Sequence, residues 1–371
     1  MIKLPRCFFC GLFFPLVLST SAAAHKTENI FFISVDGFRW QEVFGGAEAL
    51  LMNKENGGVD DTNRLQAQFL RPTAEERRRV LLPFFWDVIS KHGQLYGNQD
   101  KGSAAVLTNG KKFTYPGFNE MFTGYADERI DKNEKRNNPN VTVLEWLHRK
   151  PAFAQRVVGF ANWDVHPYVL NSQRSGIPVW TGYDTNLPAT PGSRLELVQQ
   201  IHRDTTPYWP DMSYDSFYLH AALEYLKEKK PRILWLALSE TDEWAHEGRY
   251  DLYLYAAHGM DACARDLWML AQALPDYRDK TTIILTCDHG RGGGPKEWRN
   301  HGASVAGAEN IWLAVIGPDT PPLGERTNAP PIRQSQIAAT LAALLGEDYH
   351  GAVPKSAPAI GEVLPASSIS R

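Results

Sequence analysis

The stretch "TTIILTCDHG", residues 281 to 290, is a run of β-branched and apolar residues that ends on Asp288 and His289. Such a run predicts a strand that is buried on both faces. Two other apolar runs end on an acid in the same way: "NIFFISVDG" (29–37) on Asp36 and "RILWLALSETD" (232–242) on Asp242. Because ligands of open α/β sheets bind outside the carboxyl ends of the strands, the three endings predict a functional site at one rim of a sheet.

The rest of the chain alternates strand-like runs with segments of helical periodicity. This alternation predicts the α/β class, with three α/β/α layers and a mostly parallel central sheet. The expected strands are 29–37, 156–161, 232–239, 281–287 and 310–317. The expected helices are 83–93, 141–149, 215–230, 253–274 and 334–346. Polar or Gly/Pro-rich residues dominate 45–80 and 165–213, which we expect to be insertions in a single domain over 25–371.

Residues 1–24, "MIKLPRCFFCGLFFPLVLSTSAAA", have the pattern of a secretory signal peptide. Lys3 and Arg6 precede an apolar run, and small residues end the segment. The run is too short for a comfortable transmembrane helix, so we expect a secreted protein of the bacterial periplasm with no stable membrane anchor after cleavage. An uncleaved anchor is the alternative.

Charge and cysteine content narrow the class of protein further. Removal of residues 1–24, which carry two bases and no acid, changes the formal net charge from −3 to −5. Such a chain offers no basic surface for nucleic acid. Cys263 and Cys287 remain, either as a disulfide or as buried free thiols. The sequence does not indicate an oligomeric state.

Three histidines accompany the strand-end aspartates: His246, His289 and His301. Taken singly, an aspartate after a strand is more often a turn or capping residue. Six such groups on one rim would repel and desolvate one another without a cation, so the combination indicates bound metal. Asp242 and His246 are four residues apart and can chelate one ion from a helix face. Mixed imidazole and carboxylate donors favour zinc, with manganese or iron as alternatives.

A candidate nucleophile precedes a short apolar helix in "KKFTYPGFNEMFTG" (111–124). The hydroxyl of Thr114 has two interpretations. It caps the helix, or it lies beside a metal that lowers its pKa and makes it available for covalent attack.

Five segments in this order resemble the alkaline phosphatase superfamily: "SVDGFRW", "FTYPGFNEMFTG", "TDEWAHEG", "TCDHG" and "RNHG". The similarity is greatest to the type I phosphodiesterase/nucleotide pyrophosphatase-like enzymes and spans roughly residues 29 to 346. The resemblance implies an alkaline phosphatase-like catalytic domain with two zinc ions. Its ligand sets are Asp242, His246 and His301 for one ion, and Asp36, Asp288 and His289 with the Thr114 oxygen for the other.

The resemblance also implies that Thr114 attacks phosphorus and forms a phosphothreonine intermediate. The resemblance also implies a downstream asparagine that donates to a phosphoryl oxygen. The segment "ERIDKNEKRNNPN" offers Asn133, Asn137, Asn138 and Asn140, and its spacing favours Asn133. Arg39 either reaches the phosphate or forms a structural ion pair. The chain departs from the pattern at Gly117, where asparagine is common, and at Trp244, where a small residue is common. Aromatic residues in the 165–213 region and just before it are candidate stacking surfaces for the substrate: Trp163, Trp180 and Tyr183.

The resulting hypothesis is a secreted di-metal phosphoesterase that hydrolyses phosphodiester or pyrophosphate bonds of a small-molecule phosphate ester. A phosphomonoesterase or phosphonate hydrolase of the same superfamily is one alternative. A sulfatase is disfavoured because "TYPGF" lacks the arginine of the sulfatase nucleophile motif. A periplasmic protein that binds metal or ligand without turnover is the alternative from another class.

Overall fold

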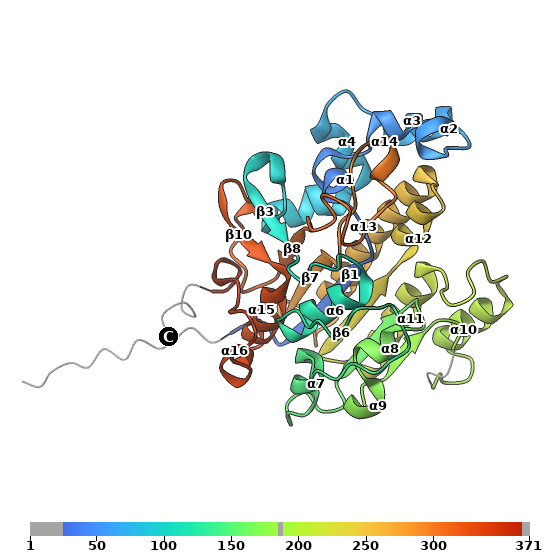
Figure 1. Cartoon of the computed structure of the whole chain (residues 1–371). Coiled ribbons are helices and arrows are strands. Elements are labelled where there is room, and N and C mark those ends of the chain that lie inside the picture. Colours follow the sequence, from blue (N-terminus) through green and yellow to red (C-terminus); the bar gives the residue numbers. More distant parts are fainter. Residues whose placement is uncertain (1–24, 185–187, 366–371) are drawn as a thin grey trace, which may run out of the picture.

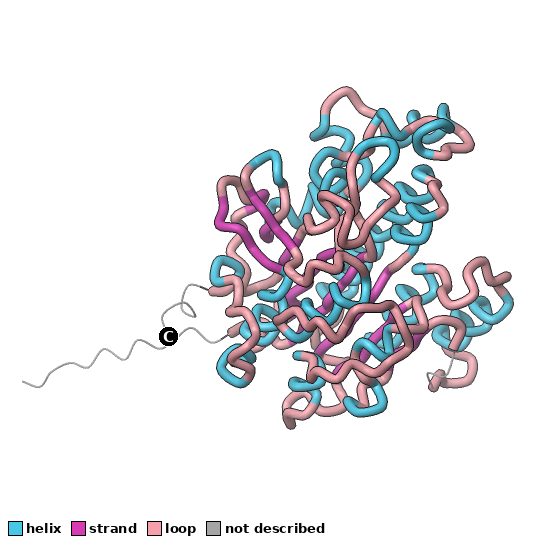
Figure 2. The backbone as a smooth tube through the Cα atoms, viewed as in Figure 1, coloured by secondary structure: helices cyan, strands magenta, loops and turns pink. Residues whose placement is uncertain are grey.

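The computed structural model describes residues 25–184 and 188–365 as an α/β fold (Figures 1 and 2). The expected signal peptide lies outside these residues. Within them, no helix has both the length and the apolar character needed to span a membrane.

An eight-stranded sheet forms the centre of the fold, in the order β5-β4-β6-β1-β7-β8-β2-β9. The strands are β1 (Asn29–Val35), β2 (Gly93–Tyr96), β4 (Val157–Ala161), β5 (Val179–Thr181), β6 (Ile233–Leu238), β7 (Thr281–Cys287), β8 (Leu313–Ile316) and β9 (Gly324–Glu325). Only β8 runs antiparallel to its neighbours in this sheet. The α/β class and the mostly parallel sheet are therefore confirmed, and each of the five expected strands is present.

The sequence did not indicate the strands that depend on pairing with distant segments. β2 and β9 extend the sheet beyond β8, while β3 (Ser103–Val106) and β10 (Ala329–Arg333) form a separate two-stranded sheet. The expected helix 83–93 is present over residues 83–92 and ends one residue early, because Gly93 begins β2. Its centre is a π-helical turn at Phe85–Ile89, followed by α5 (Ser90–His92).

Helices cover both faces of the sheet. Phe32 of β1 and Trp235 of β6 are in register and contact Phe122 of α6 (Thr114–Thr123) on one face. On the other face, α11 (Asp215–Lys229) contacts β4 and β6, and α13 (Tyr250–Ala273) contacts β1. The other helices are α1 (Trp40–Gly45), α2 (Lys54–Gly57), α3 (Thr62–Phe69), α4 (Ala74–Leu81), α7 (Val143–His148), α8 (His166–Val169), α9 (Ser172–Ser175), α10 (Arg194–Asp204), α12 (Glu240–His246), α14 (Gly294–Glu297), α15 (Ile337–Leu344) and α16 (Tyr349–Ala352), with 3-10 turns at Ala49–Leu51, Gln99–Lys101, Gln334–Gln336 and Gly361–Val363.

The two expected insertions have regular structure. Residues 45–80 contain α2, α3 and α4, and residues 165–213 contain α8, α9, α10 and the edge strand β5. The sequence named no helices in these segments, because their short elements follow capping residues rather than long hydrophobic repeats. Thr73, for example, forms a capping box with Glu76 at the start of α4.

One buried histidine supports the helix that carries the candidate nucleophile. The ring of His166 contacts Phe118, Trp163 and Trp235 edge to face. Burial lowers the pKa of His166 from its ordinary value of 6.5 to about 3. The neutral ring is therefore part of the folded core, and protonation favours the unfolded chain.

We predict that this histidine makes stability depend on pH. Its contribution is complete above pH 6.5 and is lost progressively as the pH falls toward about 3, because only the unfolded chain takes up the proton. Between pH 7 and pH 5 the free energy of unfolding of the wild type should fall by about 2 kcal/mol more than that of His166→Phe. Urea unfolding with EDTA present in both samples measures the difference. Parallel pH profiles of the two proteins would contradict the prediction.

Candidate metal centre

The carboxyl ends of three adjacent strands bring the predicted aspartates to one rim of the sheet. β1 lies between β6 and β7, and Val35 is in register with both Leu238 and Cys287. Asp36 and Asp288 directly follow β1 and β7, and Asp242 lies in α12 just after β6. The parallel pairing of the strands in this register therefore brings the three aspartates together, as the strand endings predicted.

The first group of candidate ligands is buried at the ends of β1 and β7. The carboxylates of Asp36 and Asp288 and the ring of His289 offer donor atoms within 4.8 Å of one another. His289 Nε2 lies 3.1 Å from Asp36 Oδ1. Among the described residues, Asp36 Oδ1, Asp288 Oδ2 and His289 Nε2 are buried and have no hydrogen-bond partner. Buried polar atoms are rarely left unpaired, so these three donors fit a cation between them.

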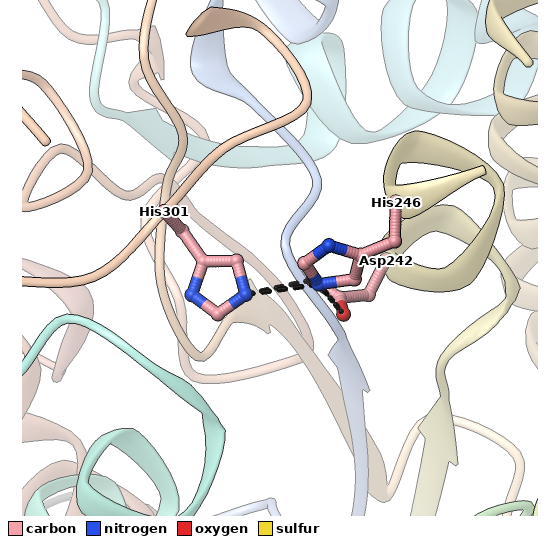
Figure 3. A group of neighbouring side chains, drawn as sticks. All are labelled: Asp242, His246 and His301. Atoms are coloured by element: carbon pink, nitrogen blue, oxygen red, sulfur yellow. Dashed lines mark hydrogen bonds and ion pairs between the residues drawn. The ribbon is translucent and has the colours of Figure 1, made fainter. Parts of the chain in front are cut away.

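The second group combines Asp242 and His246 of α12 with His301, which lies in the glycine-rich loop of residues 290–302 (Figure 3). His246 Nε2 lies 2.9 Å from Asp242 Oδ2 and 3.0 Å from His301 Nε2. The rings of His289 and His301 stack with centroids 4.1 Å apart, so the two groups adjoin. The structure thus brings together both predicted ligand sets, and the i, i+4 spacing of Asp242 and His246 places them as expected.

The electrostatics of the rim also fit bound cations. Burial, followed by repulsion from the neighbouring aspartates, raises the pKa of Asp36 and of Asp288 well above their usual range. Burial, followed by the neighbouring His289, lowers the pKa of His301 to about 2, so its ring is a neutral ligand. A divalent ion in each group would compensate the buried carboxylates. The donor sets fit two divalent cations, and the mixture of imidazole and carboxylate suits zinc.

Thr114 is the first residue of α6 rather than its cap. The capping position is Phe113, and no side chain caps the helix there. The interpretation of Thr114 as a capping residue is therefore wrong. Its side chain is nearly buried at the end of a ten-residue helix, where backbone N–H groups favour anions.

Contacts on either side of Thr114 connect its segment to both ligand groups. Two residues earlier, the carbonyl of Lys112 accepts hydrogen bonds from Gly302 N (3.0 Å) and faces His301 Nδ1 (3.2 Å). Lys112 adopts a left-handed φ of 58°, and the contact with His301 leaves Nε2 of that ring for a cation. Three residues later, Gly117 lies against the carbonyl of Asp288, where an added Cβ would be 2.5 Å from the oxygen. This close approach explains glycine at 117.

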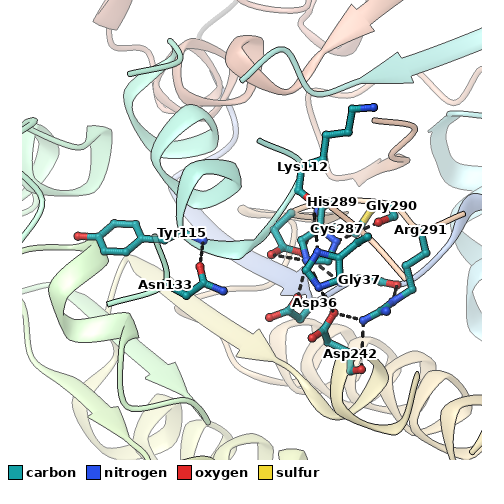
Figure 4. A network of polar contacts seen from close by, with 12 residues as sticks. Asp36, Gly37, Lys112, Tyr115, Asn133, Asp242, Cys287, His289, Gly290 and Arg291 are labelled. Carbon is teal, nitrogen blue, oxygen red and sulfur yellow. Dashed lines mark hydrogen bonds and ion pairs between the residues drawn. The ribbon is translucent and has the colours of Figure 1, made fainter. Parts of the chain in front are cut away.

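Asn133, the asparagine that the spacing favours, lies near the start of α6 (Figure 4). Its Oδ1 accepts a hydrogen bond from Tyr115 N at 2.9 Å, and the side chain is exposed. This bond fixes the amide and leaves its NH₂ group as a donor next to Thr114.

Arg39 does not reach this site. It is fully buried, its guanidinium bonds to Glu42 and to Glu48 (2.9 Å), and it donates to Gly292 O at 3.2 Å. Of the two interpretations of Arg39, the phosphate contact is wrong and the structural ion pair is correct. Through Gly292, Arg39 supports the loop between Asp288 and His301.

Arg291 was not among the predicted site residues, although it follows "DHG" directly. Its buried guanidinium bonds to Asp242 and donates to Gly37 O at 3.1 Å (Figure 4). Although burial opposes ionisation, Arg291 is the largest factor holding the pKa of Asp242 well below its usual range. The sequence signal that could have identified Arg291 is its position directly after the metal-ligand motif "DHG".

The expected stacking surfaces are not open platforms. Trp180 is buried against Phe160 and Tyr218, and Tyr183 stacks on His202. Trp163 is partly buried and donates to Asp211. Trp244 of α12 packs with Tyr208 and Trp209.

Both cysteines of the described residues are buried free thiols. Cys263 lies in α13 and Cys287 ends β7. This resolves the question that the sequence left open.

No protein-family profile matches the chain, and no curated protein is significantly similar in sequence. Solved structures are similar in fold. A phosphonate monoester hydrolase from Silicibacter pomeroyi has a TM-score of 0.56 at 13% identity over 93% of this chain and 78% of that chain. The lipoteichoic acid synthase LtaP from Listeria monocytogenes has a TM-score of 0.55 at 12% identity over 88% and 74%. Murine ectonucleotide pyrophosphatase/phosphodiesterase 5 has a TM-score of 0.51 at 13% identity over 91% and 100%.

These neighbours are members of the alkaline phosphatase superfamily, and the chain has the fold of that superfamily. The resemblance first recognised in five short motifs is thus confirmed at the level of the fold.

We predict that the chain binds two divalent ions and that Asp242→Asn binds one. Glu243→Gln, on the same helix but in neither ligand group, should keep both ions. Metal analysis of the purified proteins by mass spectrometry measures the stoichiometry. Chelation should also lower the melting temperature of the wild type, because the ions bind only the folded chain. Equal metal content in the wild type and Asp242→Asn would contradict the assignment.

Proposed function

We propose that the protein is a metal-dependent hydrolase of phosphate esters that uses Thr114 as its nucleophile. The observation that supports this proposal is the position of Thr114 at the N-terminus of α6, two residues after the contact of Lys112 with His301 and three before that of Gly117 with Asp288. A protein that only binds metal has no need of a hydroxyl held at this point.

Each ligand group would bind one cation. Asp36, Asp288 and His289 would hold one, together with the Thr114 oxygen, and Asp242, His246 and His301 the other, with zinc as the preferred metal. When bound, such ions neutralise the charge that develops on a transferred phosphoryl group and favour the ionised form of an adjacent hydroxyl.

The chain's own residues define the remaining chemistry. Thr114 Oγ1 attacks phosphorus while the bond to the leaving oxygen breaks, which gives a phosphothreonine. Asn133 donates from Nδ2 to a non-bridging phosphoryl oxygen, since its Oδ1 is already used by Tyr115 N. Attack of water on the phosphothreonine then regenerates the hydroxyl.

His246 marks the open side of the site. Its side chain is 46% exposed, whereas that of His289 is fully buried. The leaving group and the incoming water have access from this side, while the buried group holds the nucleophile.

The proposed substrates are diesters or pyrophosphates of small molecules. Support comes from the motif resemblance and from a nucleotide pyrophosphatase/phosphodiesterase of the same fold. A phosphonate monoester hydrolase also has this fold, so the phosphonate alternative is kept as an outcome of the test. The pattern of residues 1–24 supports secretion into a bacterial periplasm.

Side-by-side assays of a nitrophenyl phosphate monoester and its diester test the substrate class. We expect kcat/KM of the zinc-loaded protein to favour the diester by about a hundredfold, or about 2.7 kcal/mol of transition-state stabilisation. A strong preference for the monoester would instead indicate a phosphatase. Turnover of neither ester, with metal bound, would point to a phosphonate or to a protein that only binds.

Substitution of the nucleophile separates an enzyme from a binding protein. Thr114→Ala should lower kcat by about 10³-fold or more, because the covalent step is lost. Its metal content should change little, since the aspartates and histidines remain. Thr114→Ser restores a hydroxyl and is the matched control. Retention of wild-type kcat by Thr114→Ala would contradict the proposed role.

The contact at Gly117 predicts a purely positional effect on catalysis. In Gly117→Ala the new Cβ meets the carbonyl of Asp288, so α6 has to move away from the rim. We expect kcat to fall by about 10²-fold, because a displacement of about 1 Å misaligns a nucleophile to that extent. Metal content should be unchanged. Gly45→Ala, at an open position of another helix, is the control and should retain wild-type kinetics.

A further inference from the structure

A polar cavity lies at the amino ends of the central strands, whereas the metal ligands lie at their carboxyl ends. It has a volume of about 540 Å³ and is lined by residues at the amino ends of β4, β6, β1 and β7, which are consecutive in the sheet. Its basic lining residues are Arg156, Lys230, Arg232 and Lys280, and its acidic ones are Glu28 and Asp276. Because β1 has seven residues, the strands separate this cavity from the metal centre by roughly 20 Å.

The sheet register places the two arginines side by side. Val157 of β4 pairs with Ile233 of β6, so Arg156 and Arg232 immediately precede a pair of neighbouring residues. The carbonyl of Arg156 accepts hydrogen bonds from Arg232 N (2.8 Å) and Ile233 N (3.0 Å), which fixes the two backbones against each other. The proximity of these like charges is therefore built into the pairing of β4 and β6.

The two acids of the cavity form their ion pairs with the lysines. Lys230 pairs with Asp276 at 2.8 Å, and Lys280 pairs with Glu28 at 3.2 Å. Within residues 25–184 and 188–365, neither Arg156 nor Arg232 forms an ion pair with a carboxylate. The cavity therefore carries an excess of two positive charges, although the chain as a whole is acidic.

Backbone carbonyls accept hydrogen bonds from both guanidinium groups. Arg232 donates from Nε to Glu28 O at 2.8 Å and from Nη1 to Ala152 O at 3.3 Å, and it stacks on Phe153. Arg156 donates from Nη2 to Lys230 O at 3.2 Å, where Lys230 has a left-handed φ of 49°. Arg232 Nη2 and the Nε and Nη1 of Arg156 have no partner among the described residues. Two oriented guanidinium groups with free donors match a tetrahedral oxyanion.

We propose that this cavity, which we call the basic cavity, binds a phosphate-type oxyanion at a site separate from the metal centre. The anion would accept hydrogen bonds from Arg156 and Arg232 and relieve their mutual repulsion. The cavity is larger than a phosphate ion, so it also has room for a phosphorylated small molecule. The site does not depend on the proposed activity, because none of its residues lies at the catalytic rim.

Equilibrium dialysis of the metal-loaded protein against radiolabelled inorganic phosphate tests the site. We expect Arg156→Gln to bind one equivalent fewer than the wild type, or to bind that equivalent about tenfold more weakly, because a charged hydrogen bond is lost. Lys229→Gln removes the same charge from an exposed position outside the cavity and should bind like the wild type. Asp242→Asn should retain the equivalent in the basic cavity, which separates this site from binding at the metals.

Arg232→Gln gives a second measurement, with circular dichroism to confirm that the variant is folded, since Arg232 also packs on Phe153. Glycerol phosphate that binds more tightly than inorganic phosphate would identify a phosphorylated small molecule as the ligand, whereas equal affinity would identify the free ion. The proposal is overturned if Arg156→Gln and the wild type bind equal amounts of phosphate with equal affinity.

Discussion

The convergence of buried carboxylates at the ends of β6, β1 and β7 is the constraint on which the site depends. Asp36 and Asp288 follow adjacent strands directly, and the register of those strands leaves them no freedom to separate. Burial of two like charges costs several kcal/mol unless an opposite charge accompanies them. The fold therefore either protonates these groups or binds cations, and the imidazole of His289 beside them, a common metal ligand, favours the second solution.

The surrounding loops serve this convergence by bringing other groups to it. Arg39, whose charge is neutralised by two glutamates, donates a hydrogen bond to the carbonyl of Gly292. The carbonyl of Lys112 accepts a hydrogen bond from Gly302 N, next to His301. Gly117 lets α6 approach the carbonyl of Asp288. The site therefore combines residues from five segments of the chain. The contacts that position these segments are made to backbone carbonyl and N–H groups.

The elements that the sequence predicted correctly are those whose signal is local. The apolar runs that end on Asp36 and Asp288, and the i, i+4 pair of Asp242 and His246, can be recognised without knowing their neighbours. β2, β9 and the β3/β10 pair are short and gain their hydrogen bonds from distant partners, so no local pattern marked them. The same limit explains why the sequence did not decide between the two roles of Arg39. Its motif suggested a phosphate contact, whereas its partner Glu48 became evident only in the fold.

Arg291 makes the two ligand groups electrostatically unequal. Asp36, Asp288 and His289 supply two carboxylates, whose charge a divalent cation would cancel. Asp242, His246 and His301 supply one carboxylate, and Arg291 already offsets its charge. A cation in this second group would leave it strongly positive, and its His246 side is also the side open to solvent. Under the proposed function, an anionic phosphoryl group approaching from solvent would therefore be attracted first to the second group.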